Sequence, residues 1–308
     1  MRKCGFLISA AVLALSAAAF APYSYEGEWG SSVRYIAVAP NGNVYGTHRA
    51  GHKVRYFSPT GTFLGEWGEW GESNGQFRYP LDIDVASNGR VYVCDYLNYR
   101  IQYFTLTGSF LGKWGSEGSG NNQFTFPRYV SIGPGGDVYV LDGSTTCRIK
   151  YYTATGSFLG KWDLDYVGSP NGLGVSPLTG RVYITDQDYD RVVYYSSTGS
   201  FLGEWGRWGS GPGQFINPEG ITVSRDGRGR VFVVDTDNDR VQYFTPTGSC
   251  IGIIAEQGRF RFPLDIAVSW TGARFYVYDN WYPCVKYFKR TTPAVVPTSL
   301  GKVKTLFR

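Results

Sequence analysis

The stretch DIDVASNGRVYVCDYLNYRIQYFTLTGSFLGKW, from Asp82 to Trp114, decides the fold. It holds four runs of apolar residues in alternation with polar ones, separated by SNG, DYLNYR and TLTGS. Short alternating runs with turn residues between them predict a four-stranded antiparallel meander, whose strands we name a to d in chain order. Such a sheet alone leaves both faces apolar, so it needs another sheet stacked on each face.

The same pattern recurs along the whole chain. Strand b of each copy ends at an equivalent residue, which is His48, Asp95, Asp142, Asp186, Asp235 or Asp279. The steps between these residues are 47, 47, 44, 49 and 44 residues. Six copies of a self-stacking sheet predict an all-β protein, a six-bladed β-propeller of four-stranded antiparallel blades. The composition agrees, because 41 glycines and 24 tyrosines beside a single methionine favour short aromatic strands and tight turns over packed helices.

Three segments are expected along the chain. Residues 1–21 have the basic start, apolar middle and small-residue end of a secretory signal peptide. Residues 22–290 are predicted to form the propeller, and residues 291–308 a basic C-terminal tail or a closing strand. We therefore expect a secreted or cell-envelope protein, extracellular or periplasmic, with no stable membrane span after signal cleavage.

Two segments compete to close the ring. YEGEW at residues 25–29 matches the strand-d text FLGEW, and SLGKV at residues 299–303 is the alternative. Either segment supplies a fourth strand to the last blade, and the sequence leaves the choice open.

Charge and cysteine content limit the partners. Removal of Arg2 and Lys3 lowers the formal net charge from +5 to +3, and with no basic stripe this argues against a nucleic-acid partner. The remaining cysteines are Cys94, Cys147, Cys250 and Cys284. They contain no CxxC motif, so a zinc site is not expected, and both disulfides and isolated thiols stay open.

The repeated consensus is QF-x-x-P, a strand, NG or GG, VYV-x-D, N-x-R-[IV]-x-x-[FY] and TG-x-FLG-x-W. It resembles the NHL repeat, most closely at residues 91–104 and 231–244. The resemblance implies a six-bladed propeller and, in many NHL proteins, an interaction module. Streptogramin lyases and gluconolactonase-like propellers share this fold and use metal and acid or base groups at the channel mouth. The multi-histidine zinc site of the peptide-amidating lyases is not expected, since the chain has only His48 and His52.

An Asp and a basic residue recur at the two ends of the b to c connection, where an ion pair would pin the hairpin. These structural positions are Asp95 and Arg100, Asp142 and Arg148, Asp186 and Arg191, and Asp235 and Arg240. The third repeat has one more residue between its Asp and Arg than the others.

In a propeller, the b to c and d to a connections share one face, which we call the variable-loop face because these loops differ most between repeats. Polar residues near the start of each strand a predict a ring at the channel mouth on this face. The ring consists of Arg34, Asp82, Arg128, Glu219 and Asp265. It would bind a polar ligand or a divalent metal, or form a hydrated channel mouth.

Three tryptophans fall in the same set of loops: Trp70, Trp208 and Trp281. They would contact a carbohydrate or a protein if exposed, or fold back over a neighbouring blade. The carboxylates of Asp235, Asp237 and Asp239 alternate as in a calcium loop, but the glycine and distal glutamate of such a loop are missing, so no metal is expected there.

Two functions from different classes follow. The first is a secreted non-catalytic scaffold that engages a protein or glycan partner through the variable-loop face, and it includes assembly into a homo-oligomer or filament. The second is a metal-assisted lyase or hydrolase with its site at the channel mouth. No cofactor is expected beyond that divalent metal.

Overall fold

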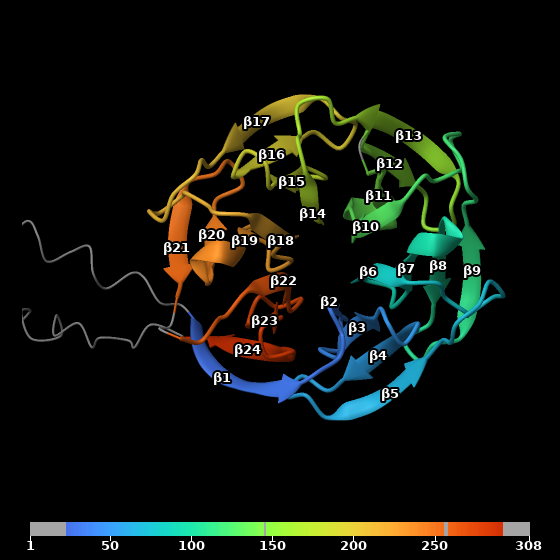
Figure 1. The fold of residues 1–308 in the computed structure, drawn as a ribbon, viewed down its shortest axis with the longest axis horizontal. Coiled ribbons are helices and arrows are strands. Elements are labelled where there is room, and N and C mark those ends of the chain that lie inside the picture. The colour runs from blue at the N-terminus through green and yellow to red at the C-terminus, as the bar shows by residue number, and fades with distance from the viewer. Residues whose placement is uncertain (1–22, 145, 256–257, 292–308) are drawn as a thin grey trace, which may run out of the picture.

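Six four-stranded antiparallel sheets stand around a central channel (Figure 1). This is a computed structural model, and it describes residues 23–144, 146–255 and 258–291 of the 308-residue chain. The predicted all-β, six-bladed propeller is confirmed. In these ranges only three short 3-10 turns are helical: η1 (Tyr96–Asn98), η2 (Pro134–Gly136) and η3 (Thr236–Asn238). No helix among the described residues is long and apolar enough to cross a membrane.

The strands follow the repeat in chain order, with strand a innermost in each blade (Figure 1). Blade 1 holds β2 (Tyr35–Val38), β3 (Val44–His48), β4 (Lys53–Phe57) and β5 (Phe63–Trp67). Blade 2 holds β6 (Pro80–Val85), β7 (Val91–Asp95), β8 (Arg100–Phe104) and β9 (Phe110–Trp114). Blade 3 holds β10 (Pro127–Ile132), β11 (Val138–Asp142), β12 (Arg148–Tyr152) and β13 (Phe158–Asp163). Blade 4 holds β14 (Pro170–Val175), β15 (Val182–Asp186), β16 (Arg191–Tyr195) and β17 (Phe201–Trp205). Blade 5 holds β18 (Pro218–Val223), β19 (Val231–Asp235), β20 (Arg240–Phe244) and β21 (Cys250–Ile254).

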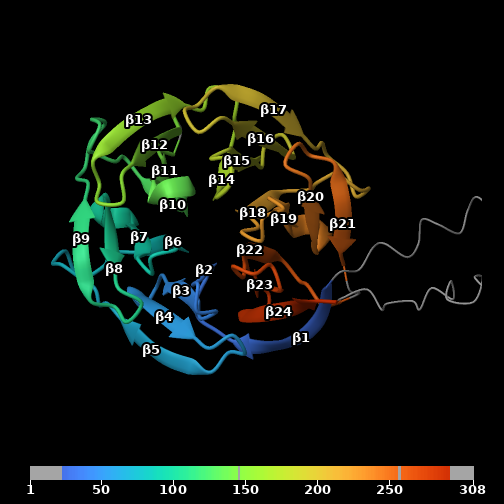
Figure 2. The ribbon, with the colours of Figure 1, turned by 180° about the vertical axis from the view of Figure 1, so that it is seen from behind.

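Blade 6 joins the two ends of the propeller. It consists of β22 (Pro263–Val268), β23 (Arg274–Asp279), β24 (Cys284–Arg290) and the N-terminal strand β1 (Tyr23–Gly30). β1 runs along β24 in both views, with Tyr23 opposite Arg290 and Gly30 opposite Cys284 (Figure 2). The segment at 25–29 therefore supplies the fourth strand. The alternative at 299–303, the signal-like residues 1–21 and most of the C-terminal tail lie outside the described residues.

A tryptophan of strand d links a blade to the next in every blade but blade 5, whose strand d reads CIGII. Trp67 packs against Phe104 of blade 2, with ring centroids 5.7 Å apart. A Cβ added at Gly108 would stand 2.6 Å from the Trp67 indole, and the φ of Gly108 is +88°. Only glycine combines that backbone angle with so close an approach. The TG and the tryptophan of the consensus are thus two halves of one contact between neighbouring blades.

The Asp and Arg of the b to c connection form ion pairs inside the blades. Arg100 Nε lies 2.7 Å from Asp95 Oδ2, and Arg240 Nε lies 2.6 Å from Asp235 Oδ2. In blade 4 the corresponding distance, between Arg191 and Asp186, is 3.0 Å. Each Asp also accepts a backbone N–H from the loop that enters its own blade, as Asp235 does from Ile216 at 2.8 Å. These carboxylates hold the variable loops to the sheets.

Blade 3 departs from this pattern. Asp142 pairs with Lys150 Nζ at 3.0 Å, and Arg148 instead lies 3.4 Å from Asp163 on the neighbouring strand. Lys150 stands where blades 2 and 5 have a glutamine, so its ammonium takes over the role of the arginine. Blade 6 uses the same solution, with Lys286 Nζ 2.7 Å from Asp279. The Asp142 and Arg148 pair expected from the repeat is therefore replaced, because a lysine two residues along strand c reaches the carboxylate.

The four cysteines of the described chain are free thiols: Cys94, Cys147, Cys250 and Cys284. All but Cys250 are buried. They act as small apolar residues of the blades.

Candidate functional site at the channel mouth and on the variable-loop face

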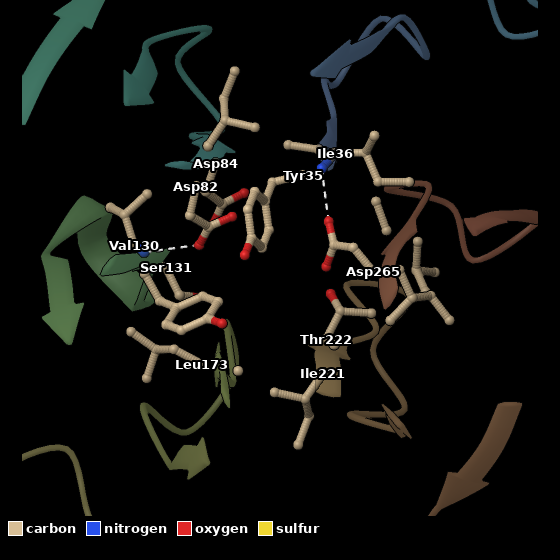
Figure 3. A pocket seen from close by; sticks show the side chains of 18 of the residues that line it. Tyr35, Ile36, Asp82, Asp84, Val130, Ser131, Leu173, Ile221, Thr222 and Asp265 are labelled. Carbon is tan, nitrogen blue, oxygen red and sulfur yellow. Dashed lines mark hydrogen bonds between the residues drawn. The ribbon is translucent and has the colours of Figure 1, made fainter. Parts of the chain in front are cut away.

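One layer of the channel is built from the same position of the innermost strand in every blade. Its members are Tyr35, Asp82, Tyr129, Gly172, Gly220 and Asp265. The Tyr35 side chain projects into the channel between Asp82 and Asp265 (Figure 3). Tyr129 meets the Tyr35 ring edge-on, with centroids 5.9 Å apart, and donates its hydroxyl to Asn171 Oδ1 at 2.9 Å. The two tyrosine rings therefore fill most of this layer, and the glycines of blades 4 and 5 leave room for them.

The carboxylates of this layer are tied to the next blade. Asp82 Oδ2 accepts the Val130 N–H at 2.9 Å, and Asp265 Oδ2 accepts the Ile36 N–H at 2.7 Å (Figure 3). Burial raises the pKa of Asp82 well above its usual range, and the negative charge of Asp265 raises it further. Burial also raises the pKa of Asp265 to about 7. The two groups therefore hold protons at a pH where exposed carboxyls are ionised.

An ion pair crosses the channel at its other end. Arg225 follows β18 in blade 5, and its guanidinium contacts both carboxylate oxygens of Asp84 in blade 2, at 3.0 and 3.1 Å. The Trp270 ring lies 4.3 Å from the same guanidinium. The channel leaves about 50 Å³ for water-sized molecules, which is room for a few waters. A larger ligand must therefore bind at the mouth or on the face around it.

The predicted ring is divided between two levels. Asp82 and Asp265 line the channel, whereas Arg34, Arg128 and Glu219 stand one residue earlier on their strands and outside its lining. Arg34 stacks on Tyr35 at 5.6 Å and Arg128 on Tyr129 at 5.5 Å. Successive residues of a strand point in opposite directions, so a residue next to one that faces the channel faces away from it. The ring predicted as one set is an inner acidic pair and an outer group of two arginines and a glutamate.

The outer group is electrostatically unusual. Burial raises the pKa of Glu219 to about 7, and nearby Arg34 and Arg128 only partly oppose this effect. The Nε of Arg34 is buried with no hydrogen-bond partner among the described residues. Glu219 is therefore a carboxyl that can give or take a proton near neutral pH.

The donor set does not fit a resident metal ion. Within the described ranges, no group of three or more His, Cys, Asp or Glu side chains is placed to hold one. His52 Nδ1 accepts the Tyr79 N–H at 3.1 Å. In the loop that alternates carboxylates, Asp235 is paired with Arg240 and Asp239 Oδ1 accepts the Phe262 N–H at 2.8 Å. Asp237 contacts the Asn217 amide, so these three carboxylates serve different partners.

The three predicted tryptophans project into solvent. Trp70 is 66% exposed, Trp208 is 72% exposed and Trp281 is 62% exposed. They do not fold back over the neighbouring blades. The guanidinium of Arg78 lies 5.9 Å from the Trp70 ring, and that of Arg261 lies 5.8 Å from the Trp281 ring. Each of these two exposed rings has a planar cation beside it.

Further exposed aromatic residues lie in the same loops. Tyr166 is 74% exposed, Tyr189 is 61% exposed, and Tyr282 is also exposed. Tyr79 and Phe262 adopt φ angles of 62° and 58°, which bulky residues rarely do. Their N–H groups are held by the preceding blade, and their side chains are left on the surface. The sequence signal that would have found Tyr166 and Tyr189 is the shortness of the loop before blade 4.

Comparison with known proteins agrees with the fold. The NHL repeat family matches residues 77–104. No curated protein sequence matches the chain significantly. Among solved structures, virginiamycin B lyase from Staphylococcus aureus is 15% identical, with a TM-score of 0.56 over 88% of this chain and 90% of that one. A putative gluconolactonase is 12% identical, with a TM-score of 0.66 over 89% of this chain and 94% of the other.

A gluconolactonase from Xanthomonas campestris is similar as well. It is 14% identical, with a TM-score of 0.63 over 87% of this chain and 88% of that chain. At such identities the likeness shows a shared fold and leaves the site to be judged from its own residues. The chain is a six-bladed β-propeller that carries an NHL repeat at residues 77–104.

Proposed function

We propose that the protein binds a glycan through its variable-loop face, as a secreted or cell-envelope binding protein. The observation that carries the proposal is the set of exposed aromatic side chains in the loops of this face. The set consists of Trp70, Tyr79, Tyr166, Tyr189, Trp208, Phe262, Trp281 and Tyr282. An exposed ring stacks on the C–H face of a pyranose, while planar charged groups beside it bind the hydroxyls.

The arrangement favours a glycan over a protein partner. Protein interfaces concentrate their aromatic anchors in a central, desolvated patch. Here the aromatic residues come from loops of different blades, and several of the rings have a cation beside them. Arg49 lies 4.7 Å from the Tyr79 ring, and Arg191 lies 4.7 Å from the Tyr189 ring. Rings spread over several blades, with polar partners beside them, suit the successive units of a sugar chain.

Co-sedimentation with insoluble cellulose, chitin, β-1,3-glucan and peptidoglycan tests the proposal. The wild type is expected to sediment with at least one of them. A triple variant, Trp70→Ala, Trp208→Ala and Trp281→Ala, is expected to lose about tenfold or more in affinity. The control replaces three exposed leucines of the outer strands, Leu64, Leu111 and Leu159, by alanine and should bind as the wild type does. No sedimentation with any polysaccharide, or equal binding by the triple variant, would overturn the proposal.

A second candidate is lyase or hydrolase chemistry at the channel mouth. It is favoured by Glu219, whose pKa of about 7 suits proton transfer at neutral pH. Similarity to a virginiamycin B lyase and to gluconolactonases suggests the substrates to try. Incubation with a streptogramin B antibiotic and with gluconolactone, with and without added divalent cations, tests it. Turnover that Glu219→Gln abolishes would support this candidate, and no turnover of either substrate would remove it.

A further inference from the structure

We propose that blade 4 carries a pocket for an uncharged hexose unit of the glycan. This inference rests on the proposed function and names one place where the sugar chain is held. The pocket has a volume of about 660 Å³, within the range of about 300–1,000 Å³ that is usual for ligand sites. Its lining is made by Asp165, Tyr166, Val167, Gly168, Tyr189, Arg191, Phe201 and Glu204.

The pocket lies beside a shortened loop, and among the connections between blades only the one at 31–34, which enters blade 1, is shorter. Twelve residues separate the last strand of one blade from the first strand of the next at 68–79, 115–126 and 206–217, whereas residues 164–169 make the same connection in six. Each long loop buries a phenylalanine completely: Phe77, Phe124 or Phe215. The short loop has no such residue, so the space above strands β16 and β17 stays open.

The short loop also uncovers the arginine of the repeat. In blade 5 the Arg240 guanidinium donates to the carbonyls of Ser210, Gly211 and Gln214 in the long loop. In blade 4 the described contacts of Arg191 are with Asp186, Glu204 and the Tyr166 carbonyl. The side chain of Arg191 is accordingly 18% exposed, compared with 8% for Arg240. A guanidinium has five N–H groups and three have described acceptors, so Arg191 keeps two donors at the edge of the pocket that it lines.

The chemistry of the lining fits a sugar. Tyr166, Tyr189 and Phe201 give three exposed aromatic rings, and the Arg191 guanidinium lies over the Tyr189 ring at 4.7 Å. The Glu204 carboxylate is held by Arg191 at 2.7 Å, which fixes a donor and an acceptor side by side. Neighbouring hydroxyls of a pyranose present a donor and an acceptor at the same spacing.

Charge selects among sugars. The lining contains two carboxylates, Asp165 and Glu204, and one guanidinium, Arg191. A uronic acid or a sulfated sugar would be repelled by the excess negative charge. An uncharged hexose, including its N-acetylated form, meets no such penalty.

The chain contains a matched control. Strand d reads FLGEW in blade 4 at 201–205 and in blade 1 at 63–67. Phe63 is exposed like Phe201, and Glu66 is bound by Lys53 and Arg55 at the side of blade 1. Since none of these blade 1 residues lines the pocket, the same substitution in the two blades separates the pocket from the general surface.

Isothermal titration with cellohexaose, chitohexaose and laminarihexaose, and with a uronic and a sulfated hexasaccharide as charged probes, tests the inference. Tyr166→Ala, Tyr189→Ala and Phe201→Ala are each expected to weaken the binding of the hexasaccharide about tenfold, and Glu204→Gln about fivefold. Phe63→Ala and Glu66→Gln should stay within about twofold of the wild type. A graft that replaces residues 164–169 by the sequence of 206–217 fills the pocket and should weaken binding as much as both tyrosine substitutions together.

The outcomes separate the two proposals. If the wild type binds a hexasaccharide and the pocket variants, the graft included, bind equally well, the pocket is not a sugar site and the proposed function stands. If the wild type binds none of the three hexasaccharides and sediments with no polysaccharide, both proposals fail. If only a sulfated or uronic oligosaccharide binds, and the pocket variants reduce that binding, the inference of an uncharged sugar is wrong.

Discussion

Arg225 and Asp84 stand in opposite blades of the ring and meet across the channel, where Arg225 Nη2 donates to both carboxylate oxygens of Asp84. Both side chains are about 15% exposed, so the pair is shielded from water without being dry. Arg225→Met leaves the Asp84 carboxylate without its counter-ion and should lower the free energy of unfolding by about 2 kcal/mol. Arg228→Met changes a more exposed arginine on the same turn and should cost less than about 0.5 kcal/mol. Equal effects in urea unfolding would show that the cross-channel contact adds no stability.

The acidic pair makes stability depend on pH. The pKa of Asp265 is raised to about 7 in the folded protein, so the folded state binds this proton more tightly than the unfolded chain does. The stabilisation is complete below the usual Asp pKa and is lost as the pH rises through about 7. Asp265→Asn keeps an acceptor for the Ile36 N–H and removes the titration. The stability of this variant relative to the wild type should therefore rise by about 1 kcal/mol or more between pH 5 and pH 8. A difference that does not vary with pH would contradict the raised pKa.

The repeated arginines should contribute different amounts to the free energy of unfolding in different blades. Arg240 is nearly buried and holds both Asp235 and a long loop, whereas Arg191 is more exposed and borders the open pocket. Arg240→Met should cost about 3 kcal/mol because it strands a buried carboxylate, and Arg191→Met about half as much. Thermal unfolding of the two variants checks the ranking. A larger loss of stability from Arg191→Met than from Arg240→Met would contradict this ranking, because blade 4 would then depend more strongly than blade 5 on its ion pair.

The closure of the ring predicts a new disulfide. Gly30 lies directly opposite Cys284, and a Cβ at Gly30 would meet nothing within 4 Å. Gly30→Cys should oxidise to a disulfide with Cys284 and raise the Tm by roughly 5 °C, while the reduced variant melts near the wild type. Ser24→Cys, which faces Lys289, has no such partner and should stay a thiol. Mass spectrometry without reductant decides whether the bond forms. A thiol in oxidised Gly30→Cys would show that the two side chains do not reach disulfide distance.

Repetition explains how much of the molecule could be predicted. The strands, the turns and the Trp67 to Gly108 contact recur in nearly every blade, so comparison of one repeat with another identifies them. The replacement of Arg148 by Lys150 as the partner of Asp142 could not be found in this way. It depends on which of two cations in one strand reaches a buried carboxylate, and that is a matter of side-chain geometry.

The candidate site was predicted less completely, for the same reason. Comparison of repeats identifies the structural residues that all blades share. A binding site depends instead on residues that occur in one blade, so this comparison does not identify it. Glu219 and Asp82 were found by their position near the start of strand a, but the sequence did not separate their levels in the channel. Tyr166 and Tyr189 became visible only when the six-residue loop before blade 4 was seen to leave a pocket.

Hydroxyl-radical footprinting of the protein with and without a bound hexasaccharide locates the glycan on the molecule. Saturating sugar should slow the oxidation of Trp70, Trp208 and Trp281 on the variable-loop face, together with that of Tyr189 in the pocket. The outer-strand residues Phe63 and Leu64 are also exposed and should react at unchanged rates. Protection of the outer strands with no change on the variable-loop face would contradict the account.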